Sequence, residues 1–409
     1  MGLIINIDEA LKLRTEYNIL REPLNNMLAE RQEAWEKQNP IDFLFTRSTI
    51  SSFQETYVSS IGFDHAFAET SDYAIGPIFN TAEGFSSTYR TRTFQGSFII
   101  TQQTLEDRQL GRAKDDASAF VKRWHGDIVE YAMSAISSGF DSNAPVYWGS
   151  EANGGRSKLK LNSADTTNGE IDGVKNPLFY NKHTIVKREG MSDTDIQAAY
   201  QSNIFYIEGV ELGGDDPGQI AKLADGINQV ITIMENYKDD NNKYAGVDGS
   251  KTIVSANDAR LCAALNTALS LDMFNFMGGV KGINPAYKIA TTEKTPYLRD
   301  IPQTAGGKGF FIVDKAYNAA NHGPELTERI SFTLDVIEQK RPKGIIYDGR
   351  QRFDINAASW RGIAYVYVGT PAGSSGAWDD VTKFTKITPT QTFVTPVSVV
   401  GTVTTDSST

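Results

Sequence analysis

The chain has very little cysteine, little histidine and no long hydrophobic run. Cys262 is the only cysteine among 409 residues, which excludes an intrachain disulfide. It stands beside Leu261 and Leu265 in an expected helix, so we expect a buried thiol without a chemical role. No apolar run approaches the ~20 residues that a membrane-spanning helix needs, and no basic stretch precedes an apolar segment as in a secretory signal. These absences predict a protein made and folded in a cytoplasm, with no membrane partner.

Clustered basic charge is also missing. The chain has 40 Lys and Arg against 50 Asp and Glu, a formal charge of −10. Direct binding of nucleic acid requires Lys and Arg gathered against phosphates, so this balance disfavours it. Ordinary acidic solubility is the simpler interpretation.

A search for catalytic and ligand-binding motifs finds none that holds. The glycine-rich segments 278–282 and 306–309 lack the Walker spacing and the Lys-Ser/Thr ending of a phosphate-binding loop. The histidines show no spacing typical of metal ligands. They are His65, His125, His183 and His322. We therefore expect no enzymatic activity, no cofactor and no metal.

The most informative part of the chain runs from Ser97 to Ile136. The sequence Ser-Phe-Ile-Ile-Thr at Ser97–Thr101 predicts a strand, and a very long amphipathic helix follows from Leu105 to Ser137. Such a helix would span roughly 50 Å. Its predicted apolar face consists of Ala113, Ala117, Phe120, Val121, Trp124, Ile128, Ala132 and Ile136.

An extended polar segment, Glu69 to Gln95, precedes that strand. Near its end the residues alternate loosely, with Tyr89 and Thr91 on one side and Arg90, Arg92 and Phe94 on the other. Both sides carry polar groups, so we expect neither to be a buried sheet face. A long polar hairpin is unstable alone and needs a partner surface.

The rest of the chain predicts helices and strands in both halves. Helices are expected within Asp8–Lys37, from Pro217 after a cap at Asp216, and after a cap at Asn257; strands are expected at Thr252–Val254, Tyr287–Thr291, Gly309–Val313 and within Ser331–Val368. Gly139–Gly214 reads as irregular loops and short strands, and the segment after Gly369 as a tail.

The order of these elements resembles the major capsid proteins of tailed bacteriophages, which have the Hong Kong 97-like fold. The resemblance covers roughly Ile50 to Gly369 and rests on element order and local sequence character. The residues that carry it are Gly96–Thr101, Leu105-Glu106-Asp107, the capped helix at Pro217, Lys251–Ser255 followed by Asn257-Asp258-Ala259-Arg260, and Arg361–Val366.

The resemblance implies an α+β fold with a long spine helix, an extended loop hairpin, a peripheral domain and an axial domain. It places Tyr89, Arg90, Arg92 and Phe94 on the loop as candidate contacts between subunits. The implied parts are an N-terminal arm (1–49), the first peripheral part (50–68), the extended loop (69–96), the peripheral domain with the spine helix (97–150), an inserted or irregular region (151–212), the axial domain (213–329), the peripheral return (330–369) and a C-terminal tail (370–409).

The implied function is structural. Copies would assemble into pentamers and hexamers of an icosahedral shell around packaged double-stranded DNA, in the cytoplasm of a bacterial host. The implied partners are further copies, a portal, a separate scaffold and decoration proteins. Only about fifty residues precede the body, too few for a long fused scaffolding segment.

Two other functions stay open. An encapsulin-like nanocompartment shell shares the fold and encloses a cargo protein. A glycan-binding or polysaccharide-active protein would explain the aromatic residues and the β-rich ends, and would be a soluble monomer or small oligomer.

Overall fold

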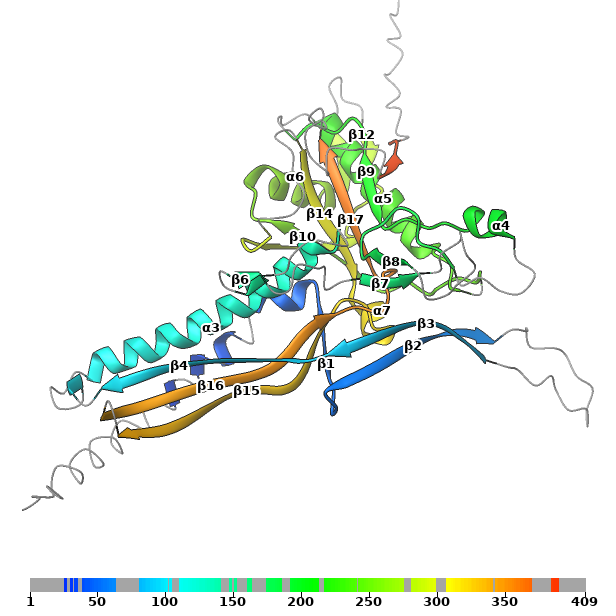
Figure 1. The fold of residues 1–409 in the computed structure, drawn as a ribbon. Coiled ribbons are helices and arrows are strands. Elements are labelled where there is room, and N and C mark those ends of the chain that lie inside the picture. Colours follow the sequence, from blue (N-terminus) through cyan, green and yellow to red (C-terminus); the bar gives the residue numbers. More distant parts are fainter. Residues whose placement is uncertain are drawn as a thin grey trace, which may run out of the picture.

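The computed structural model describes residues 26–27, 30–31, 33–35, 39–63, 81–101, 103–104, 110–140, 147–148, 151–152, 160–163, 174–185, 192–212, 217–240, 242–275, 281–298, 307–340, 343–369 and 384–389. Within these ranges the chain forms two main sheets and a long helix (Figure 1). The α+β class predicted from the sequence is confirmed. The predicted helices before residue 26 and the tail beyond residue 389 lie outside the described residues.

The first main sheet has four strands in the order β1-β15-β16-β4. Its two central strands, β15 (Glu325–Lys340) and β16 (Lys343–Asn356), form a long antiparallel ladder. The outer strands are β4 (Arg92–Thr101), antiparallel to β16, and the short β1 (Thr46–Thr49), parallel to β15. The predicted strand at Ser97–Thr101 is confirmed and begins further back, at Arg92.

Helix α3 (Leu110–Ser138) lies along one face of this sheet (Figure 1). Its 29 residues span roughly 43 Å at the α-helical rise. The predicted apolar face is buried except for Phe120, which is half-buried. The helix ends one residue beyond the predicted Ser137, and the predicted start at Leu105 lies outside the described residues.

Close packing holds α3 to the sheet. A Cβ atom on Gly349 would lie 3.0 Å from the rings of both Phe120 and Phe332, so any larger residue at this position of β16 would require the rings to shift. The indole Nε1 of buried Trp124 donates a hydrogen bond of 3.1 Å to Oε1 of Gln351. The helix therefore buries its aromatic side chains without leaving the indole nitrogen unpaired.

The second main sheet is mixed and has six strands in the order β13-β10-β14-β17-β9-β18. These are β13 (Ala290–Thr295), β10 (Lys251–Ala256), β14 (Gly307–Asp314), β17 (Ile363–Gly369), β9 (Ile204–Ile207) and β18 (Thr385–Ile387). Every residue of β17 is buried, so this strand is the centre of the main hydrophobic core.

The strand pairing joins segments that were assigned to different predicted parts. β9 pairs with β17 and is a core strand, although it falls in the region predicted as an insertion (151–212). β17 belongs to this second sheet and not to the sheet of β15 and β16, with which it was grouped as the peripheral return (330–369). β18 pairs with β9, so part of the predicted tail (370–409) completes the sheet. These short segments carry few local signals, so the sequence analysis grouped them with their neighbours along the chain. The sheet that each one joins depends instead on backbone hydrogen bonds to strands far away in the sequence.

The rest of the inserted region forms short elements. They are β5 (Tyr147–Trp148) with β6 (Glu151–Ala152), β7 (Lys160–Ser163) with β8 (Val174–Pro177), and α4 (Asp193–Ala198). Before the first sheet, η1 (Pro40–Phe43) begins after an Asn39 cap.

Two helices, α5 (Pro217–Glu235) and α6 (Ala259–Ser270), pack with the second sheet. α5 begins at Pro217, as predicted. The cap of α6 is Asp258 and not the predicted Asn257, because the Asp258 carboxylate accepts the Leu261 amide at 3.0 Å. Cys262 is half-buried, with Sγ 3.6 Å from the Ala256 carbonyl oxygen, so the expectation of a fully buried thiol is corrected.

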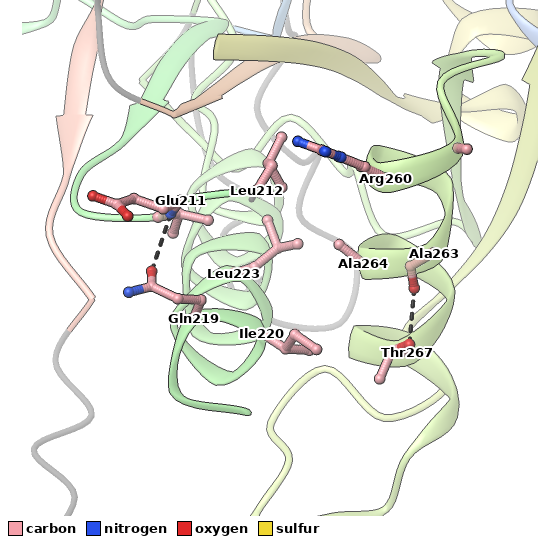
Figure 2. A pocket seen from close by; sticks show the side chains of 11 residues that line it. Glu211, Leu212, Gln219, Ile220, Leu223, Arg260, Ala263, Ala264 and Thr267 are labelled. Atoms are coloured by element: carbon pink, nitrogen blue, oxygen red, sulfur yellow. Dashed lines mark hydrogen bonds between the residues drawn. The ribbon is translucent and has the colours of Figure 1, made fainter. Parts of the chain in front are cut away.

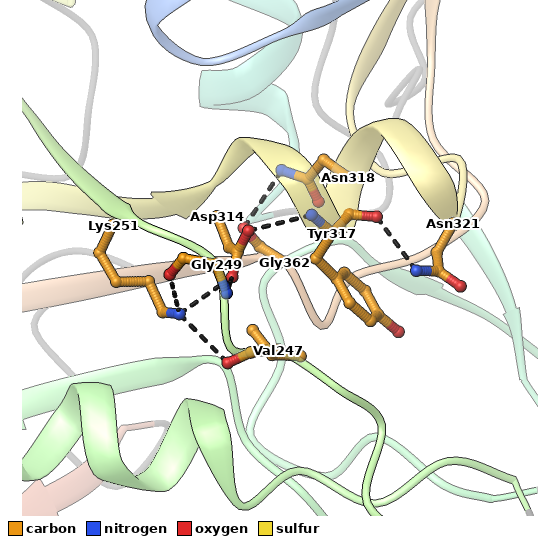
Figure 3. A network of polar contacts seen from close by, with 8 residues as sticks. All are labelled: Val247, Gly249, Lys251, Asp314, Tyr317, Asn318, Asn321 and Gly362. Carbon is orange, nitrogen blue, oxygen red and sulfur yellow. Dashed lines mark hydrogen bonds and ion pairs between the residues drawn. The ribbon is translucent and has the colours of Figure 1, made fainter.

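A buried ion pair lies where β14 leaves the second sheet (Figure 3). Lys251 Nζ donates to Oδ2 of Asp314 at 2.9 Å and to the carbonyl oxygens of Val247 at 3.1 Å and Gly249 at 2.7 Å. The two side chains are 2% and 0% exposed. All three ammonium protons therefore have an acceptor, which offsets the cost of burying the charge.

The same carboxylate starts the next helix. Oδ1 of Asp314 accepts the Tyr317 amide at 3.0 Å and caps α7 (Lys315–Ala320). From that helix Asn318 donates to the Gly362 carbonyl oxygen at 3.1 Å, directly before β17. A Cβ on either Gly362 or Gly323 would lie 2.0 Å from the Asn318 side-chain oxygen, so both positions require glycine. Three chain segments are thus joined at one point.

Replacing Asp314 by asparagine tests this joint. The variant Asp314→Asn leaves the Lys251 ammonium group buried without a counter-charge, and we expect the free energy of unfolding to fall by about 3–5 kcal/mol. Denaturant unfolding followed by circular dichroism measures it. The matched control is Glu208→Gln at the exposed Lys386–Glu208 pair, whose side chains are 57% and 44% exposed; we expect a loss under about 1 kcal/mol. Equal losses in the two variants would contradict the assignment.

Candidate assembly surface

A two-stranded hairpin projects from the body away from α3 (Figure 1). It consists of β2 (Gln54–Phe63) and β3 (Thr81–Arg90), paired antiparallel from Gln54 opposite Arg90 to Phe63 opposite Thr81. This pairing confirms an extended hairpin before the spine helix, with β2 as one of its strands. The strand β2 was predicted as part of the peripheral domain (50–68), and the predicted loop residues 69–80 lie outside the described residues.

The base of the hairpin is tied to the body by hydrogen bonds from β3. Tyr89 is fully buried, and its hydroxyl donates to the His322 carbonyl oxygen at 3.4 Å. Ser87 Oγ donates to the Ala357 carbonyl oxygen at 3.2 Å. Both acceptors lie in loops that flank the first sheet, so the hairpin leaves the body in a defined direction.

Aromatic contacts reinforce this base. The Tyr57 ring lies 4.6 Å from the Tyr89 ring and 4.0 Å from the His322 ring, measured between centroids. Burial, followed by the negative charge of Glu325, raises the pKa of Tyr89 well above its ordinary value. The Tyr89 hydroxyl therefore keeps its proton and remains a donor. We call Tyr57, Tyr89, His322 and Glu325 the hairpin-base cluster.

His322 is held in an unusual backbone conformation. Its φ angle is 50°, which few residues other than glycine adopt. Its Nδ1 lies 3.4 Å from Oε1 of Glu325, whose side chain is almost completely buried. Sequence reasoning missed this residue as part of the hairpin base. The Gly323-Pro324 pair that follows marks a turn, but no local signal shows that Tyr89 binds it.

Of the four predicted contact residues, Tyr89 and Arg90 lie in β3 of the hairpin, whereas Arg92 and Phe94 lie in β4 of the first sheet. Tyr89 is buried at the base, and Phe94 packs inside the subunit, with ring centroids 4.7 Å from Phe353 and 5.6 Å from Tyr131. The expectation that neither side of this segment is buried is wrong at Tyr89 and Thr91, which are 0% and 2% exposed; Tyr89 is covered by Tyr57 and His322. A contact of Tyr89 or Phe94 with another subunit stays a prediction.

The two arginines are at the surface. Arg90 Nε donates to Oε1 of Gln54, its partner across the hairpin, at 2.9 Å. Arg92 Nε lies 3.7 Å from Oδ2 of Asp354, with 43% of its side chain exposed. Both guanidinium groups thus keep exposed area for an acidic partner, and their role between subunits stays a prediction.

The end of the N-terminal arm also packs on α3. The rings of Trp35 and His125 stack with centroids 4.0 Å apart and an angle of 11° between planes. His125 is 5% exposed, and burial lowers its pKa to about 4. It is a structural histidine, as the sequence suggested.

The described residues hold no group of three or more His, Cys, Asp or Glu side chains suited to a metal ion. No helix among them has the length and apolar character to cross a membrane.

Comparisons with known proteins return structures but no sequence relatives. No family model matches the chain, and no curated protein matches it. The structure of Mycobacterium phage Patience is 14% identical, with 88% of this chain and 89% of that chain covered and a TM-score of 0.43. The bacteriophage PhiM1 mature capsid is 9% identical, with 80% and 88% covered and a TM-score of 0.41. The virus-like particle from Pyrococcus furiosus is 8% identical, with 86% and 98% covered and a TM-score of 0.39.

The solved structures to which the chain is similar are thus capsid and virus-like particle proteins, the class predicted from the sequence. With TM-scores below 0.5, this likeness supports no inference about individual residues. The roles of individual residues therefore rest on the contacts within this chain.

The pKa of His125 predicts a loss of stability in mild acid. Below its ordinary pKa of about 6.5 the unfolded chain binds a proton that the folded chain refuses until about pH 4. The protein should therefore keep its full free energy of unfolding above about pH 6.5. Between that pH and about pH 4, the free energy of unfolding should fall by up to ~1.4 kcal/mol per pH unit. Arg47 and Glu328 line the same cavity as His125 and are unchanged in the test.

The variant His125→Phe keeps a ring against Trp35 but binds no proton. Denaturant unfolding at pH 7, 6 and 5 should show wild type losing stability relative to this variant as the pH falls. Other titrating groups, including buried His183, cancel in the difference. A difference that stays constant over this range would refute the assignment.

Proposed function

We propose that this chain is the major capsid protein of a tailed bacteriophage. Copies assemble into pentamers and hexamers of an icosahedral shell that encloses packaged double-stranded DNA. The observation that carries the proposal is the projecting β2–β3 hairpin, which is tied to the body at its base and whose described strands pair with each other outside both main sheets.

The physical argument concerns stability. A two-stranded hairpin is marginal in water, and this one lies outside both main sheets. The hairpin-base cluster holds the hairpin in one direction, and this restriction costs conformational entropy. Contact with another subunit would offset that cost. A neighbouring subunit that covers the hairpin supplies the missing surface, and a closed symmetric shell repeats each contact many times.

The first sheet offers a surface that could receive a neighbour. Ile99, Ile346 and Ile337 are directly opposite one another on adjacent strands β4, β16 and β15. Ile99 and Ile337 are 38% and 49% exposed, whereas Phe98 and Ile100 face the helix. An exposed apolar row on a sheet face is typical of a contact surface.

The wider proposal includes partners and place. The protein has no catalytic role and takes no cofactor; its partners are further copies, a portal, a separate scaffold and decoration proteins, and assembly takes place in the bacterial cytoplasm. The chain's net charge of −10 suits a wall that surrounds DNA without binding it tightly.

Shortening the hairpin tests the proposal. Replacing residues 60–83 by Asn-Gly keeps Tyr57, Tyr89 and the base intact while removing the projecting part. We expect a thermal unfolding midpoint within a few degrees of wild type, because the core is untouched, and no closed shells in negative-stain micrographs. A control that exchanges only Tyr244, an exposed residue in the segment after α5, for Ser should assemble normally. Normal shells from the shortened chain would refute the role of the hairpin.

The content of purified particles separates the remaining candidates. Packaged DNA recovered from particles made in an infected host supports a phage capsid, whereas a single co-purified enzyme indicates a nanocompartment shell. A protein that stays a ~45 kDa monomer under all assembly conditions would instead point toward a glycan-binding function.

A further inference from the structure

A group of exposed apolar side chains lies at a small hairpin beside α5. Strands β11 (Met273–Asn275) and β12 (Lys281–Ile283) pair with Met273 directly opposite Ile283. These two side chains are 46% and 78% exposed. Leu271 and Tyr287 flank the hairpin and are each 42% exposed. We call these four residues the hairpin edge.

The hairpin edge faces away from its own subunit. Phe274, next to Met273, is 2% exposed and belongs to the main core. Because successive residues of a strand point to opposite sides, Met273 and Ile283 are turned outward. Several large apolar side chains exposed together mark a surface that another protein covers, and methionine is enriched in such surfaces.

A groove of matching character lies between α5 and α6 (Figure 2). Its volume is about 280 Å³. Its apolar lining includes Leu212, Ile220, Leu223, Ala263 and Ala264.

Two polar side chains of the groove wall are already bonded within the subunit. Gln219 Oε1 accepts the Glu211 amide at 3.0 Å, and Thr267 Oγ1 donates to the Ala263 carbonyl oxygen at 2.8 Å (Figure 2). These two side chains therefore offer little to a polar ligand, and the groove suits an apolar occupant whose charged neighbours meet Arg260 and Glu211.

We propose that the hairpin edge of one copy docks in the α5–α6 groove of the next copy. Charge complementarity favours a second copy as the occupant. Exposed Asp272 and Lys288 flank the hairpin edge, and exposed Arg260 and Glu211 flank the groove. Each acidic residue of one surface thus has a basic counterpart on the other.

The contact joins two different surfaces, so it runs head to tail and closes into a ring when the rotation fits. The inference rests on the proposed function, because it assumes that many copies assemble. It specifies that the hairpin edge and the α5–α6 groove are the surfaces that meet around each ring.

Cysteine cross-linking of mixed copies tests the docking. The native thiol is first removed by Cys262→Ser. One preparation then carries Ile283→Cys, and a second, with a mass tag, carries Ala263→Cys in the groove. The mixture is assembled and treated with oxidised glutathione, which accepts the two electrons and two protons released when the thiols form a disulfide. We expect the main covalent product to be the dimer of one tagged and one untagged chain. The matched control exchanges Ile283→Cys for Tyr244→Cys, at an exposed position in the segment after α5, and should give no such dimer.

Each outcome decides between stated alternatives. Cross-linking in the Ile283→Cys preparation alone would replace the head-to-tail contact by a like-with-like contact and overturn the proposal. Shells that form normally without the mixed dimer would also overturn it and leave the capsid function standing. Wild-type protein that forms neither rings nor shells would instead overturn the proposed function on which the docking rests.

Discussion

The Lys251–Asp314 ion pair is the constraint on which the arrangement of the two main sheets depends. Asp314 ends β14, accepts the buried ammonium group and caps α7 with the same carboxylate. The short helix leads directly to His322, whose carbonyl oxygen receives the Tyr89 hydroxyl. A charge buried in the second sheet thus helps to set where the projecting hairpin leaves the first. Such a pair stabilises little by itself, but it penalises any arrangement that separates its members.

The subunit combines a closely packed core with two hairpins that lie outside its main sheets. Helix α3 packs its aromatic side chains onto glycine positions of the first sheet, and β17 is buried along its whole length. The β2–β3 hairpin and the β11–β12 hairpin lie outside both main sheets. In a protein that works by assembly, this division is expected, because the core must hold its shape alone while the projecting parts gain their stability from neighbours.

The candidate contact residues show how far sequence reasoning reaches. Alternation near Arg90 and Arg92 correctly indicated extended structure, and both arginines are exposed. It did not reveal that Tyr89 and Phe94 are covered, because burial depends on loops and a helix that are distant along the chain. His322 carries no local signal of its role, which depends only on the approach of β3. The two surfaces in the docking proposal likewise come from elements whose exposure no periodicity reports.

The sequence by itself determined the elements whose signals are local: the amphipathic face of α3, the start of α5 at Pro217, the strands within Ser331–Val368 and the absence of clustered basic charge. These follow from side-chain periodicity, capping and proline geometry, which act over a few residues. The tertiary structure decided which strands share a sheet, placing β9, β17 and β18 together although more than 150 residues separate the first from the second. Backbone hydrogen bonds between distant strands are the same for every residue type, so their partners are selected by packing of the whole core and not by local sequence.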